Sequence, residues 1–75
     1  MADLIDAASV AQRLGVSIDA VIADILSGLE GRNAFALSGG RDPALGWCVE
    51  AWDMEPARVE MHRKRLAGGS AGSRE

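Results

Sequence analysis

Apolar residues in the first part of the chain recur every three or four positions, which is the spacing of one helix face. The first run predicts a helix that starts near Asp3 or Asp6, with a break at Asp6 as an alternative, and ends before Gly15. The second run predicts the clearest helix of the chain, which Ser17 can cap and which should fray and stop at Gly28 and Gly31. The apolar positions are Leu4, Ala8, Ala11 and Leu14 in the first run, and Ile18, Val21, Ile22, Ile25, Leu26 and Leu29 in the second.

Patterning is weaker in the second half of the chain. Residues 34–37 are a short apolar piece that fits a loop, a helical turn or one short strand of a wing, and we favour the loop or helical turn. Pro43 suits the first position of a third helix, which we expect to continue to Trp52. In the same way, Pro56 begins a predicted fourth helix that continues through Leu66.

Residues 8–21 have the pattern of two helices joined by a tight turn. The small Ala11 lets the helices approach closely, and Gly15 supplies the permissive backbone that a tight turn needs. Val16 fits the angle between the helices, and Ser17 can cap the second one. The segment resembles the helix-turn-helix of bacterial and phage DNA-binding proteins, including small regulators and terminase small subunits. The residues that carry this resemblance are Ala11, Leu14, Gly15, Val16, Ser17 and Val21.

The resemblance implies that this segment forms a helix-turn-helix and that the partner of the protein is double-stranded DNA. The Leu-Gly-Val-Ser string also occurs in helical modules that bind no DNA, such as the N-terminal module of translation initiation factor two. A helix-turn-helix that serves only as a scaffold is therefore the alternative. Placing Gly15 over Asp53 aligns the two halves of the chain, so Cys48 to Leu66 is either a second hairpin of this kind or an ordinary helical hairpin.

Composition favours one small globular domain with a thin core. Hydrophobic residues make up 48% of the chain, but one Phe and two Trp are the only aromatic residues, so burial in a partner or a homodimer would add stability. No apolar run approaches the roughly 20 residues that span a bilayer. The absence of a signal-peptide pattern and the lone Cys48 favour a cytoplasmic location. We expect an all-α fold of three to four short helices with a helix-turn-helix-like unit, with one domain over residues 1–67 and a disordered tail over 68–75.

The start of the predicted second helix carries few groups that could read DNA. Ser17 is the only plausible hydrogen-bond donor there, and the carboxylates of Asp19 and Asp24 would oppose the approach of phosphates. Asp19, Ala23 and Asp24 instead form a face that suits a basic protein partner. Trp47 is a candidate anchor for the same partner.

Cations near the C-terminal end are the better candidates for contact with nucleic acid, although the net charge of the chain is −3. Arg58, His62 and Arg65 are spaced to share one helix face, and Arg63 and Lys64 flank it. A solvated cationic helix end is the alternative. The predicted nucleic-acid contacts are Ser17, Arg58, His62, Arg63, Lys64 and Arg65.

Two functional classes follow, and neither is enzymatic. The first, which we favour at this point, is a DNA-binding accessory protein or regulator of phage or mobile-element type. The second is an acidic protein-binding module, such as an inhibitor, adaptor or antitoxin-like factor, that uses the helical fold as a scaffold. We predict no catalytic residues, no cofactor and no metal site, because the sequence has no triad, phosphate loop or set of metal ligands. Cys48 fits a buried small hydrophobe better than a nucleophile.

Overall fold

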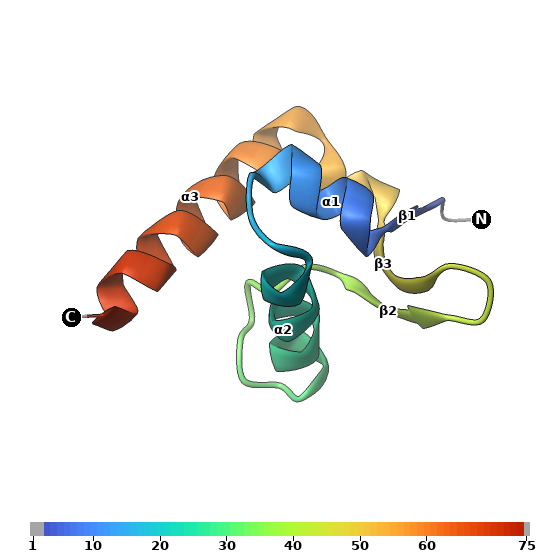
Figure 1. Ribbon diagram of the computed structural model, residues 1–75, viewed down its shortest axis with the longest axis horizontal. Helices are drawn as coiled ribbons and strands as arrows, with labels where there is room; N and C mark the ends of the chain where they lie inside the picture. Colours follow the sequence, from blue (N-terminus) through green and yellow to red (C-terminus); the bar gives the residue numbers. More distant parts are fainter. Residues whose placement is uncertain (1–2, 75) are drawn as a thin grey trace.

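The computed structural model describes residues 3–74, with side chains described for residues 3–67. The fold mixes helices with one three-stranded antiparallel sheet of order β1-β3-β2 (Figure 1). The elements in chain order are β1 (Leu4–Asp6), α1 (Ala7–Leu14), α2 (Ile18–Leu29), β2 (Gly39–Asp42), β3 (Gly46–Glu50), the 3-10 turn η1 (Ala51–Met54) and α3 (Pro56–Arg74). The expected all-α fold is therefore wrong.

A hairpin of β2 and β3 replaces the third helix expected from Pro43. Asp42 does cap a turn, because its Oδ2 atom accepts the backbone N–H groups of Ala44 at 2.9 Å and Leu45 at 3.0 Å. Gly46 then takes a φ of 76°, and the chain reverses into β3 instead of continuing as a helix. An aspartate followed by proline suits both a helix start and this turn, so local signals alone favoured the wrong element.

Strand β1 shortens the first predicted helix. It pairs with β3, which removes Leu4 from the helical face that its spacing predicted. The helix begins after Asp6, the second of the two predicted starts, and the Asp6 carboxylate caps it by accepting the N–H of Ser9 at 3.1 Å. Because β3 also includes Cys48, the second helical hairpin expected from that residue is wrong.

The predicted turn between α1 and α2 is confirmed. Gly15 has a φ of 71°, and its N–H donates to the carbonyl of Ala11 at 2.8 Å, which ends α1. Ser17 caps α2, since its Oγ atom accepts the N–H of Ala20 at 3.1 Å. Val21 is fully buried in the core that α1 and α2 share. These interactions are local, which is why the sequence predicts them.

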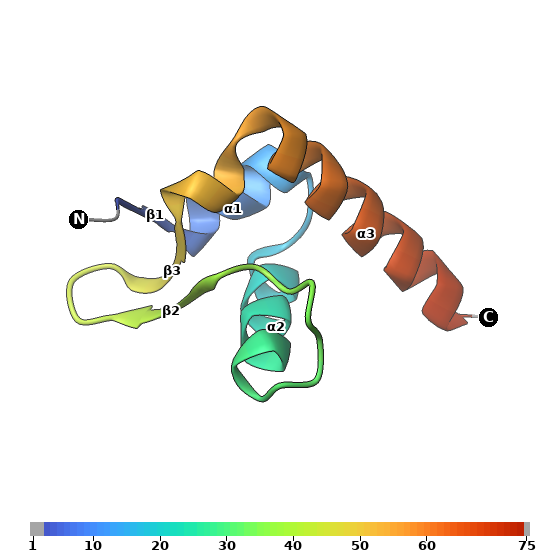
Figure 2. The same ribbon diagram turned by 180° about the vertical axis from the view of Figure 1, so that it is seen from behind.

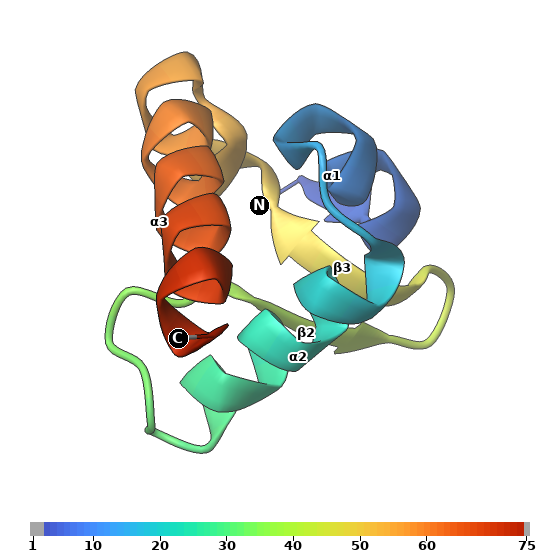
Figure 3. The same ribbon diagram turned by 60° about the vertical axis from the view of Figure 1, so that its left-hand side comes forward.

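The core lies where α1, α2 and β3 meet, and α3 packs beside α1 (Figure 3). The loop or turn favoured for residues 34–37 is confirmed, and its last residue, Leu37, is buried. The buried apolar residues are Ala7, Val10, Ala11, Leu14, Val21, Ile25, Leu37, Val49 and Met54. The hairpin and the end of α3 extend from this core in opposite directions (Figures 1 and 2).

Helix α3 begins at Pro56, as predicted. Residues 68–75, where a disordered tail is expected, include the end of α3 up to Arg74, and their side chains lie outside the described part of the chain. None of the described helices is both long and apolar enough to cross a membrane.

Candidate functional site

The face of α2 predicted to bind a basic partner is divided between solvent and interior. Asp19 and Ala23 are exposed, and Ser17 is exposed at the start of the helix. Asp24 is buried and turns toward α3. The surface of α2 is therefore less acidic than the sequence suggests, because Asp24, one of its two aspartates, is buried.

The same helix exposes a row of large apolar side chains. Ile18, Leu26 and Leu29 are 46%, 37% and 61% exposed, and Ile22 between them is half-buried. These four positions are spaced at i, i+4, i+8 and i+11, so they form one continuous stripe, which we call the α2 apolar face. Val21 and Ile25 fill the core instead, which means that α2 has more apolar surface than its own domain covers.

Arg58, His62 and Arg65 of α3 share one helix face, as their spacing predicts, but this face points into the protein. Arg58 donates from Nε to Oδ1 of Asp53 at 2.7 Å. His62 is fully buried, and its Nε2 atom lies 3.0 Å from the same oxygen. Arg65 reaches across to Asp24 on α2. These five residues form what we call the buried polar network.

Asp24 is the end of this network on α2. Arg65 binds it with two hydrogen bonds, from Nη1 to Oδ1 at 2.7 Å and from Nη2 to Oδ2 at 2.9 Å, in the paired geometry that suits a guanidinium and a carboxylate. The backbone N–H of Leu37 also donates to Oδ2 at 2.9 Å. Burial alone would raise the pKa of Asp24, but the hydrogen bonds from Arg65 and Leu37 outweigh it and lower this pKa below its usual value.

Asp53 is the other anionic centre of the network, and no part of its side chain is exposed. Its second oxygen accepts the backbone N–H of Ser38 at 2.9 Å, so both oxygens have partners. Burial alone would raise the pKa of Asp53, but the hydrogen bonds from His62, Ser38 and Arg58 outweigh it and lower this pKa. The sequence predicts no such role for Asp53, whose only signal is a carboxylate five residues before Arg58.

The remaining predicted nucleic-acid contacts lie on the surface. Arg63 donates from Nη2 to the backbone carbonyl of Arg13 at 2.6 Å, which places it against the end of α1. Both Arg63 and Lys64 also lie 3.7 Å from carboxylate oxygens of Glu60. The structure therefore separates the six predicted residues, with Ser17, Arg63 and Lys64 exposed and the other three turned toward the network.

The two tryptophans have different environments. Trp47, the predicted partner anchor, packs partly against the core, and the guanidinium of Arg41 lies 5.7 Å from the centre of its ring. Trp52 is the more exposed one, at 47%, and its Nε1 atom donates to Glu50 at 2.6 Å. The Arg58 guanidinium stacks over the Trp52 ring at 5.2 Å. Trp52 is therefore an exposed but already stacked side chain.

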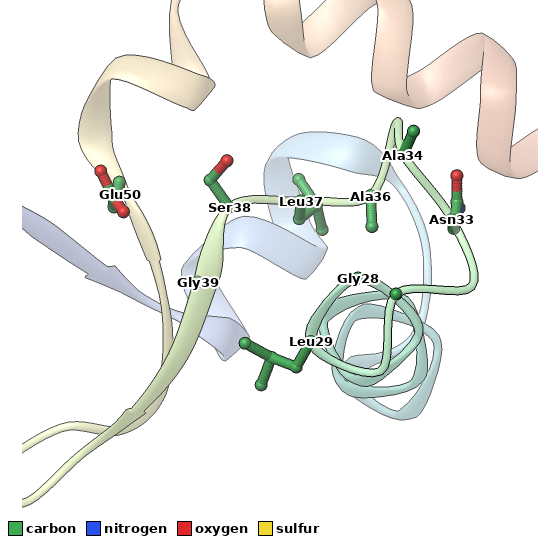
Figure 4. Close-up of a pocket in the computed structure, with 10 residues that line it drawn as sticks. Gly28, Leu29, Asn33, Ala34, Ala36, Leu37, Ser38, Gly39 and Glu50 are labelled. Atoms are coloured by element: carbon green, nitrogen blue, oxygen red, sulfur yellow. The ribbon is translucent and has the colours of Figure 1, made fainter.

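An open pocket of about 540 Å³ lies between the end of α2, the following loop and β2 (Figure 4). Small residues such as Gly28 and Ala36 line it, and Glu50 supplies its one carboxylate. The described residues contain no group of three or more His, Cys, Asp or Glu side chains that could hold a metal ion. Burial raises the pKa of the Cys48 thiol, which disfavours the thiolate needed for nucleophilic chemistry.

Comparisons with protein-family models, with curated proteins and with solved structures find no match to this chain. The resemblance of residues 8–21 to helix-turn-helix proteins therefore stays a prediction. The two distinctive features of the structure are the α2 apolar face and the buried polar network.

Proposed function

We propose that the protein is a non-enzymatic protein-binding module whose α2 apolar face contacts a partner protein. The observation that carries this proposal is the exposure of Ile18, Leu26 and Leu29 along one stripe of α2. Fully burying a wholly exposed side chain of this size contributes about 1.5–3 kcal/mol, and because these three are 37–61% exposed, a partner that covers them gains roughly half of that from each. Helix-turn-helix geometry then acts as the scaffold that presents this stripe.

The charge distribution supports a protein partner over a polyanion. Of the basic side chains that the structure describes on α3, Arg58 and Arg65 are paired with buried carboxylates and His62 is fully buried. The exposed start of α2 carries Asp19, whose charge opposes phosphate groups. A partner surface with an apolar centre and a cation opposite Asp19 fits this face, since interfaces commonly have an apolar core and a polar rim.

Double-stranded DNA is the second candidate because the turn geometry and the exposed Ser17 favour it. Helix-turn-helix proteins place the N-terminal residues of the second helix in the major groove. Arg63 and Lys64 remain on the surface and could contact phosphates. Against this, the α2 residues available to face the groove are mainly apolar side chains, which carry no hydrogen-bond donors for base edges.

A capture experiment with matched variants tests the proposal. The tagged protein and its I18S/L29S variant are used to capture partners from a cell extract, and each captured protein is then purified and titrated by calorimetry. We expect a partner whose affinity falls at least tenfold in the variant. The control is L45S, which removes a 47% exposed leucine at the hairpin turn, away from α2, and should leave this affinity unchanged. Equal affinities for wild type and I18S/L29S would contradict the proposal.

A further inference from the structure

The protonation state of His62 follows from its two neighbours. Its Nδ1 atom lies 2.7 Å from Nη2 of Arg65, and a guanidinium can only donate, so Nδ1 must accept and carry no proton. Its Nε2 atom lies 3.0 Å from Oδ1 of Asp53, a carboxylate that can only accept, so Nε2–H donates. Both ring nitrogens are thus satisfied by the neutral imidazole with its proton on Nε2.

The formal charges around His62 cancel in this state. Asp53 faces it from η1, and Asp24 reaches it through Arg65 from α2. Arg58 and Arg65 supply two positive charges from α3 against these two carboxylates. The hydrogen bond between α3 and α1 joins Arg63 to a backbone carbonyl, so it adds no acidic group. A proton added to His62 would leave one uncompensated positive charge in a buried cluster.

That proton would also act on one particular hydrogen bond. It would have to enter at Nδ1, the only ring nitrogen without a hydrogen, and it would then point at the Arg65 guanidinium. The Nη2 group that donates to Nδ1 also donates to Oδ2 of Asp24. Moving Arg65 away from His62 therefore disturbs the contact between α3 and α2. Oδ2 of Asp24 also holds the loop before β2 through the N–H of Leu37.

We propose that the buried polar network is an acid-sensitive lock, in which protonation of His62 at Nδ1 displaces Arg65 and releases α2 and its following loop from α3. The hydrogen bond lost is Nη2–H to Nδ1, and the proton comes from solvent. His62 is the only histidine of the chain, so no second imidazole can produce the same response. The lock does not depend on the protein-binding role proposed for α2.

Nuclear magnetic resonance on the wild-type protein tests the lock directly. Long-range ¹H–¹⁵N spectra of the imidazole, recorded from pH 8 to pH 5, report its protonation and tautomer. Hydrogen exchange of the Leu37 amide, measured over the same range, reports the contact with Asp24, and the Gly15 amide in the α1–α2 turn serves as the control. We expect the Nε2–H tautomer at neutral pH. As the imidazolium forms, Leu37 protection should fall roughly tenfold or more relative to Gly15. A protonated His62 with unchanged Leu37 protection, or an Nδ1–H tautomer at neutral pH, would overturn the proposal.

A non-titrating variant gives a second, independent test. In H62Q the side-chain amide can accept from Arg65 and donate to Asp53 without gaining a proton. We expect its melting temperature to stay constant between pH 8 and pH 5 while that of the wild type falls. Parallel curves for the two proteins would contradict the lock. If H62Q does not fold, the spectra of the wild-type protein still decide the question.

Discussion

Arg65 of α3 and Asp24 of α2 form a two-bonded ion pair with N–O distances of 2.7 and 2.9 Å, across a sequence separation of 41 residues. The sequence predicts that they belong to two separate binding surfaces, Arg65 to a basic one and Asp24 to an acidic one. In the fold they are partners of each other. This pairing removes the strongest charge argument for nucleic-acid binding and leaves the α2 apolar face as the most distinctive exposed surface.

Removing one member of that pair should destabilise the fold strongly. R65A leaves the buried Asp24 carboxylate without its guanidinium, and breaking a buried pair in this way costs about 3–5 kcal/mol. Urea unfolding followed by circular dichroism measures the loss. The matched control is K64A, whose side chain is 76% exposed and should change the free energy of unfolding by less than about 0.5 kcal/mol. Similar stabilities for R65A and K64A would show that the pair is not structural.

The two buried carboxylates should make the protein sensitive to strong acid. Asp24 and Asp53 have lowered pKa values, so their contribution to stability is complete above their usual pKa of about 3.8 and is lost as pH falls through the lower values of the folded state. Acid unfolding monitored by circular dichroism should therefore show a stability loss below about pH 4. A stability that does not change between pH 4 and pH 2 would contradict these interactions.

Two adjacent glycines of β2 should respond very differently to alanine. A Cβ atom at Gly39 would overlap the carbonyl oxygen of Cys48, which is backbone and cannot move away easily. At Gly40 a Cβ would meet no atom within 4 Å. We expect G39A to lose about 1–3 kcal/mol or more, as overpacked sites do, and G40A to stay near wild type in thermal unfolding. Equal effects would mean that β2 and β3 do not approach each other as closely as described.

Substitutions on the α2 apolar face should affect binding without affecting folding. I18S and L29S remove side chains that are 46% and 61% exposed, so each should change the free energy of unfolding by less than about 1 kcal/mol. I25A empties a fully buried position on the same helix and should cost about 2–5 kcal/mol. Chemical unfolding of the three variants measures whether I25A loses much more stability than I18S and L29S. A large loss of stability in I18S or L29S would show that the face is part of the core.

The elements that the sequence predicted correctly depend on local interactions. The α1–α2 turn follows from Gly15 and from the cap at Ser17, which act within a few residues of their own positions. Strand β1 could not be predicted from its own residues, because it exists only through pairing with β3, more than forty residues away. The buried polar network could not be predicted for the same reason, because it joins residues that are far apart in the sequence. Helical spacing correctly put Arg58, His62 and Arg65 on one face but could not show that this face points inward.

Duplex DNA binding measured by fluorescence anisotropy across a range of salt concentrations separates the two candidate functions most directly. If α2 presents a protein-binding face and the α3 cations are structural, the wild-type protein should show no salt-sensitive binding, even at low ionic strength. Binding that weakens steeply with salt and is lost in R63A/K64A would contradict this. It would establish the helix-turn-helix as a DNA-binding unit whose phosphate contacts lie at the exposed cations of α3.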